Sequence, residues 1–148
     1  MSTITEEFNT GNFAAYSRDT SKTFLHDIRT KQETLTNSTG SPVTWLVGTI
    51  MGRVTASSKL IPLASGASDG SQIPVGILYE EVTIPATSDL ENVTICISGT
   101  VDGAGLVFDG SDDLTTMITG RTIEDRLNAD TLGIKVEVSD ELTKLDNI

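Results

Sequence analysis

The chain reads GTIMGRVT at residues 48–55, KLIPL at 59–63 and DGSQIPVGIL at 69–78, and this stretch decides the fold. Its apolar runs, rich in Ile, Val and Thr, are interrupted at short intervals by Gly, Pro, Ser and Asp, a pattern typical of short β-strands joined by tight turns. Asp69-Gly70 is a turn pair, because Asp bonds to nearby backbone and Gly accepts a positive φ. Gly48 and Gly52 bracket a strand, as expected where another segment approaches closely.

The flanking segments continue the alternation of short apolar runs and turns. We expect further strands at residues 31–35, 80–84, 93–97 and 134–138, and an apolar segment at 43–47 whose Trp45 lies in the core or in a subunit interface. Thr122 and Asp125 have capping-box spacing, which predicts a helix that begins after Thr122 and ends before Gly133. The pattern also allows a second short helix over residues 112–119.

Length and charge narrow the classes of function. The 148 residues suffice for one domain with a real core. A net charge of −11 argues against nucleic-acid binding, which depends on Lys and Arg contacts with phosphate, and against an anionic membrane surface. No apolar run approaches the ~20 residues that span a bilayer, and the N-terminus lacks the basic region and apolar core of a secretory signal. We therefore expect a soluble protein made in a cytoplasm.

Residues 1–31 differ from residues 32–148. The first segment carries four basic and four acidic residues, so it is neutral and the whole charge of −11 lies on residues 32–148. It also holds four of the seven aromatic residues, namely Phe8, Phe13, Tyr16 and Phe24. Such a segment has too little apolar content for its own core and too many aromatic residues for an inert linker. We divide the chain into an extended N-terminal arm (1–31) that docks on a partner through these four residues and a single β-rich domain (32–148), the alternative being an arm that wraps on its own domain.

No set of residues predicts catalysis, a cofactor or a metal site. Cys96 alternates with apolar neighbours and has no cationic partner, so we expect a structural role. His26 is the single histidine, and it lies in the arm, which excludes a Ser-His-Asp set. The acidic turn at residues 109–113 lacks the spacing and the distant Glu of a calcium loop. We predict that the protein is not an enzyme and binds no cofactor.

The order of the parts in the central stretch resembles the lambda-type bacteriophage head decoration proteins. The similarity rests on G-T-x-x-G-x-V-T, K-L-x-P-L, D-G-S-Q and P-V-G-I-L and is clearest over residues 48–107. It implies a mostly β, β-clip-like fold, a bent ribbon with a partial barrel, one or two short helices and an extended N-terminal arm. It also implies a homotrimer at three-fold or quasi-three-fold sites on the outer surface of the virion capsid, with the major capsid protein as partner and synthesis in the host cytoplasm.

The function implied by this resemblance is structural. The protein would decorate the phage head and stabilise the expanded capsid by clamping adjacent capsomers, and a trimer would bury those apolar residues of the central strands that alternation leaves facing outward. The alternative is a β-rich receptor- or carbohydrate-binding module of a phage tail or fibre. That alternative predicts clustered exposed aromatic residues, whereas Trp45, Tyr79 and Phe108 are spread apart in the sequence.

Overall fold

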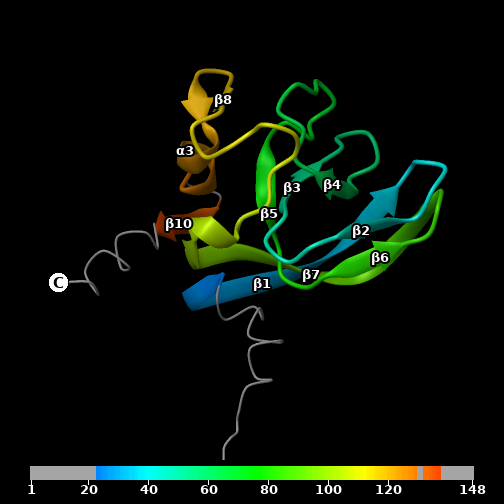
Figure 1. Ribbon diagram of the computed structural model, residues 1–148, viewed down its shortest axis with the longest axis horizontal. Coiled ribbons are helices and arrows are strands. Elements are labelled where there is room, and N and C mark those ends of the chain that lie inside the picture. The colour runs from blue at the N-terminus through cyan, green and yellow to red at the C-terminus, as the bar shows by residue number, and fades with distance from the viewer. Residues whose placement is uncertain (1–22, 130–131, 138–148) are drawn as a thin grey trace, which may run out of the picture.

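The computed structural model describes residues 23–129 and 132–137, and its main feature is a partial β-barrel (Figure 1). Five strands lie in the order β1-β4-β3-β5-β7, and a further pairing of β1 with β7 brings the two ends of this sheet together. Their bounds are β1 Phe24–Asn37, β3 Ile50–Arg53, β4 Leu60–Pro62, β5 Pro74–Leu78 and β7 Ser88–Asp102. A sixth strand, β10 (Gly133–Glu137), pairs in parallel with residues 98–102 of β7. The predicted mostly β fold with a partial barrel is confirmed.

A long antiparallel ribbon of β1 and β7 forms the base of the molecule (Figure 1). The pairing runs from Phe24 opposite Val101 to Asn37 opposite Ser88. Several register shifts interrupt it, and both Asp27 (φ 60°) and Gly99 (φ 127°) have left-handed backbone there. Such irregularities increase the twist of a ribbon and bend it. The strands expected at residues 31–35 and 93–97 are therefore the central parts of two much longer strands.

A two-stranded sheet, β2 (Val43–Trp45) with β6 (Val82–Ile84), extends beside the end of this ribbon. Asn37 joins the two. Its side chain is buried, and its Nδ2 donates to the carbonyl oxygens of Ser41 (2.8 Å), Ile84 (3.1 Å) and Pro85 (3.0 Å). This amide stabilises the end of the ribbon beside β2 and β6. Its bonds to carbonyl oxygens replace the bonds to water that the amide loses on burial.

The core consists of two clusters on opposite faces of the barrel strands. One lies between the sheet and the α3–β10 side, and its buried members are Phe24, Ile50, Leu63, Ile77, Cys96, Val101, Leu106, Ile118, Ile123, Leu127, Leu132 and Ile134. The other lies inside the barrel under β2 and β6, and its members are Leu35, Met51, Leu60, Leu78, Val82, Ile84, Val93 and Ile95. Both faces of β5 are therefore covered within one chain. Among the apolar residues of the central strands, Ile50, Ile77 and Leu78 are at most 1% exposed, whereas Val54 and Ile61 are half-buried, so the apolar excess that a trimer would bury is limited to the last two.

The turn chemistry of the central stretch is confirmed. Asp69 Oδ1 accepts hydrogen bonds from the backbone nitrogen (3.0 Å) and the hydroxyl (2.6 Å) of Ser71, and Gly70 has a φ of 105°. A Cβ added to Gly52 would lie 2.1 Å from the carbonyl oxygen of Ser71, and one added to Gly48 would lie 2.1 Å from that of Gly105. Both glycines are therefore required by a close approach of backbone to backbone.

The predicted helix exists but is shorter than expected. It is α3 (Ile123–Leu127), which Thr122 caps by accepting a hydrogen bond from the backbone nitrogen of Asp125 at 3.1 Å. Asn128, rather than the residue before Gly133, ends it. The strand that follows, β10, agrees with the prediction to within one residue at each end.

The second helix allowed over residues 112–119 is wrong. Asp113 Oδ1 accepts from the backbone nitrogen (2.8 Å) and the hydroxyl (2.6 Å) of Thr115, and such local bonds compete with helix formation. The segment continues as β8 (Met117–Ile118), which pairs with β9 (Arg121–Thr122) through a two-residue turn. Thr119 and Gly120 form this turn with φ values of 51° and 83°.

Candidate functional site

The four aromatic residues proposed to dock on a partner divide into two groups. Phe8, Phe13 and Tyr16 lie outside the described residues. Phe24 is only 6% exposed, and its ring centroid lies 4.6 Å from that of Tyr79. The side chain of Phe24 is thus part of this chain's own core, and a role in contacting another protein would require it to leave that core.

The junction between arm and barrel lies at Thr23 and Phe24. Residues 24–31, which we assigned to the arm, form the first half of β1 and pair with β7. The backbone nitrogen of Asp102 donates to the carbonyl oxygen of Thr23 at 2.7 Å. On its other side, β1 has a described partner at one position only, where Leu35 lies opposite Leu60 of β4. The edge of β1 before Leu35 therefore has no strand against it among the described residues.

An ion pair joins β1 to β3 beside this open edge. Arg53 donates from Nη2 to Glu33 Oε2 at 2.8 Å and from Nη1 to Oε1 at 3.1 Å, and Lys31 Nζ lies 3.4 Å from the same carboxylate. The hydrogen bond from Arg53 lowers the pKa of Glu33, although burial of the carboxylate acts in the opposite direction. This two-bond pair reinforces the barrel where β1 meets β4 through a single residue pair.

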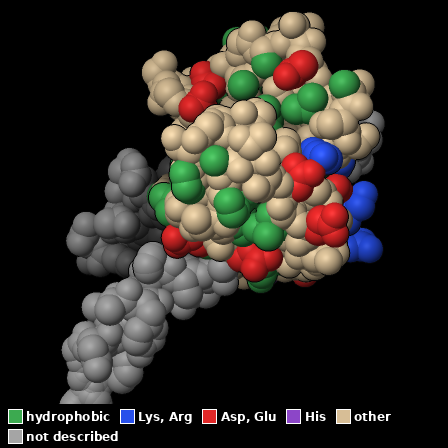
Figure 2. All heavy atoms as spheres, turned by 90° about the vertical axis from the view of Figure 1, so that its right-hand side faces the viewer, with side chains coloured by type: hydrophobic (Ala, Val, Ile, Leu, Met, Phe, Trp, Pro, Cys, Tyr) green, Lys and Arg blue, Asp and Glu red, His purple; other side chains and the backbone are tan. Residues whose placement is uncertain are grey.

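The charged side chains are unevenly distributed over the surface. Figure 2 shows one face, on which Asp and Glu are scattered while the Lys and Arg side chains gather along one edge. Three of the described basic side chains have acidic partners, since Arg53 and Lys31 bind Glu33 and Lys59 binds Asp89. Arg29 on β1 is exposed and forms no ion pair with a described residue.

The described residues do not assemble an active site. Cys96 is fully buried, and burial raises the pKa of its thiol to about 11, so the sulfur is not a nucleophile at neutral pH. His26 is exposed on β1, where its Nδ1 lies 3.5 Å from Asp27 Oδ2. Within residues 23–129 and 132–137, no three His, Cys, Asp or Glu side chains lie close enough together to hold a metal ion. No helix in this part of the chain is long and apolar enough to cross a membrane.

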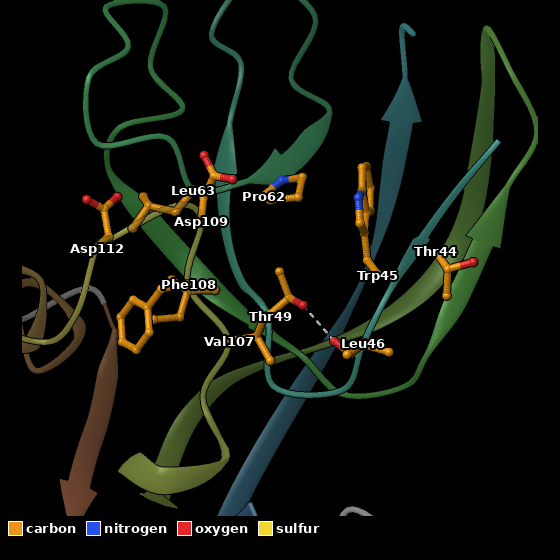
Figure 3. A pocket seen from close by; sticks show the side chains of 11 residues that line it. Thr44, Trp45, Leu46, Thr49, Pro62, Leu63, Val107, Phe108, Asp109 and Asp112 are labelled. Atoms are coloured by element: carbon orange, nitrogen blue, oxygen red, sulfur yellow. Dashed lines mark hydrogen bonds between the residues drawn. The ribbon is translucent and has the colours of Figure 1, made fainter. Parts of the chain in front are cut away.

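A concave feature that brings distant residues together is a pocket between β2, β4 and the segment after η2 (Gly103–Gly105). Its volume is about 230 Å³, and it is lined by Thr44, Trp45, Leu46, Thr49, Ile50, Pro62, Leu63, Val107, Phe108, Asp109 and Asp112. We call it the Trp45 pocket. Figure 3 shows Trp45 on one side, Phe108, Asp109 and Asp112 on the other, and Pro62 between them.

Backbone contacts fix the floor of the Trp45 pocket. Thr49 forms an isolated parallel bridge with Val107, and its hydroxyl donates to the carbonyl oxygen of Leu46 at 2.7 Å. At the acidic end, Ser65 donates from its hydroxyl to Asp112 Oδ1 at 3.0 Å. The expectation that the aromatic residues of the folded domain are spread apart is therefore wrong for Trp45 and Phe108, which line one pocket although 63 positions separate them.

Two comparisons with known proteins bear on the family of the chain. No curated protein sequence matches the chain significantly. The model of the family described as bacteriophage lambda head decoration protein D matches residues 3–120, which is 118 of the 148 residues and includes both the barrel and most of the segment before it. This match covers well over half of the chain. The chain therefore belongs to the bacteriophage lambda head decoration protein D family, a family of structural proteins of the phage capsid exterior.

Proposed function

We propose that this head decoration protein stabilises the expanded capsid by clamping adjacent capsomers, as a homotrimer at three-fold or quasi-three-fold sites, with the major capsid protein as its partner. The observation that carries the proposal is the family match, because it runs from residue 3 through the barrel and so includes the segment before β1. The family assignment also favours the head over a phage tail or fibre as the place where the protein acts.

The geometry at the start of β1 supports docking through the arm. β1 is paired with β7 on one side and lacks a described neighbour on the other from Phe24 to Thr34, which leaves backbone donors and acceptors at this edge. Such an edge can accept an added strand from another protein, in which main-chain bonds supply affinity and side-chain pockets supply specificity. Because Phe24 belongs to the core, we assign the contact with capsid protein to Phe8, Phe13 and Tyr16.

A shell-binding assay tests this proposal in the full-length protein. Replacing Phe8, Phe13 and Tyr16 together by Ala should abolish binding to expanded shells, because buried aromatic residues dominate interface energy at roughly 2 kcal/mol or more each. Circular dichroism should show an intact fold, since both core clusters consist of residues that follow Thr23. The matched control is Met117→Ala, which removes an exposed apolar side chain from β8, away from the β1 edge. Undiminished binding by the triple variant would refute docking through the arm.

The assembly state provides an independent test. Three chains would have three times the 15.7 kDa mass of one. Sedimentation of the free protein should show that species, and shells bearing the protein should release it in multiples of three. Trimerisation would let three modest arm contacts act together through effective concentration. A strictly monomeric protein both in solution and on the shell would rule out the trimeric clamp.

A further inference from the structure

The Trp45 pocket has the composition of a binding site for a particular pair of side chains. Trp45, Leu46, Pro62 and Phe108 give it an apolar surface, and Leu46 is 52% exposed at its margin. Asp109 and Asp112 add two carboxylates at one end (Figure 3). Neither carboxylate forms an ion pair with a described residue. Such a surface is complementary to an aromatic side chain that lies next to a cationic one.

We propose that the chain's own N-terminal segment fills this pocket in the free protein, with Tyr16 against the apolar surface and Arg18 beside Asp109 and Asp112. In an extended segment, residues two positions apart project from the same side, about 6.5–7 Å apart. Among the aromatic residues of 1–22, Tyr16 alone has a basic residue two positions away, since Phe8 is flanked at that spacing by Glu and Thr and Phe13 by Gly and Ala.

The reach of the chain is sufficient for this contact. Thr23 lies against Gly105, where an added Cβ would be 2.3 Å from the Thr23 hydroxyl oxygen. Gly105 precedes Phe108 by three residues, so their Cα atoms are at most about 11 Å apart, and Arg18 precedes Thr23 by five residues, which can span about 17 Å. A short tether of this kind gives an effective concentration in the millimolar range. A weak contact between the segment and the pocket is thereby strengthened without any new interaction.

The inference concerns the free protein and is independent of the proposed attachment to capsid protein. It assigns to one segment two alternative partners: the pocket of its own domain before assembly and another protein afterwards. The two contacts differ in physical character. The contact in the pocket includes an ion pair between Arg18 and the two carboxylates, so salt weakens it. Docking through the apolar residues of a neutral arm depends little on salt.

A fluorescence experiment on the full-length protein tests the inference. The chain contains one Trp, and it lines the pocket, so quenching of tryptophan emission by acrylamide reports directly on whether the pocket is covered. We expect Tyr16→Ala to increase quenching, because the loss of an aromatic hot spot lowers a docking equilibrium constant by about 30-fold. Arg18→Gln should increase quenching at low salt, and the difference from wild type should shrink as salt is added.

Controls separate this contact from a general effect of substitution. Phe8→Ala changes an aromatic residue without a basic neighbour at the required spacing, and Arg29→Gln changes an exposed basic residue on β1, so neither should alter the quenching. Asp109→Asn should reproduce the effect of Arg18→Gln. The double variant should show no further increase, because two partners of one interaction are not additive.

The outcomes that would overturn the inference are distinct. Equal quenching in wild type, Tyr16→Ala and Arg18→Gln would show that the segment does not cover Trp45. Protection that disappears on dilution would show that the segment of a second copy, rather than the chain's own, fills the pocket. Protection that arises only when a saccharide or a basic peptide is added would assign the pocket to an external ligand. Loss of shell binding with unchanged quenching would support the proposed function while refuting this inference.

Discussion

Replacing Phe24 by Ala tests whether this residue belongs to the core of the domain or contacts the capsid. The side chain is 6% exposed, lies in the cluster between the sheet and α3, and contacts the ring of Tyr79. Truncating a buried Phe to Ala costs about 3–5 kcal/mol, through the lost transfer of apolar atoms from water and the cavity left behind. At about 2–4 °C per kcal/mol for a chain of this length, the melting temperature should fall by roughly 6–20 °C.

The assay is thermal denaturation followed by circular dichroism, with all variants at one protein concentration because assembly shifts the apparent stability. Phe24→Leu is the matched control, since it keeps most of the buried volume and should cost less than half as much. Phe13→Ala serves as a second control, because it changes an aromatic residue of the segment that precedes both core clusters in the chain. If Phe24→Ala melted with the wild-type protein and yet failed to bind shells, Phe24 would be a capsid contact and its place in the core would be wrong.

Two further predictions concern the turn at Thr119 and the ion pair of Glu33. Thr119→Asn should raise the free energy of unfolding by about 0.5–1 kcal/mol, because Asn adopts the positive φ of 51° at a two-residue hairpin turn more readily than a β-branched residue; a lower urea midpoint would contradict this. Glu33→Gln should lower the free energy of unfolding by about 1 kcal/mol at pH 7, since it removes a charge-assisted bond from Arg53. The pKa of Glu33 is lowered from its ordinary value of 4.5 in the folded protein, so its contribution is present above that value and is lost as the pH falls through the folded pKa. The free energies of unfolding of the wild-type and Glu33→Gln proteins should therefore converge in acid. If the difference between them grew as the pH fell, another group would be responsible for the effect.

The parts of the fold that depend on local chemistry could be predicted from the sequence. Asp69-Gly70 and the Thr122 cap each satisfy backbone groups within a few residues, so the residue types alone indicate the turn and the start of α3. The local bonds of Asp113 with Thr115 are of the same kind. An Asp two residues before a Thr is itself a turn signal, so these residue types indicate a turn rather than a helix.

The parts that depend on pairing across the chain could not be predicted. Residues 25–31 show little alternation of apolar and polar side chains, because most of them are exposed, and only the backbone pairing with β7 makes them a strand. Composition therefore assigned Phe24 to the arm. The Trp45 pocket was missed for a similar reason, since the bridge between Thr49 and Val107 that brings Phe108 close to Trp45 has no sequence signal.

The long β1–β7 ribbon makes the resistance of the domain to a pulling force depend on direction. The N-terminal segment leaves the domain at the first of the ten residue pairs that join the two strands, and the far end of β1 is held by the buried Asn37. A force on Thr23 directed along β1 loads the whole set of backbone bonds in shear, so they must break nearly together. A force directed across the ribbon loads the pair of Phe24 with Val101 alone and then opens the others one after another. The domain would thus withstand tension along β1 far better than tension across the ribbon.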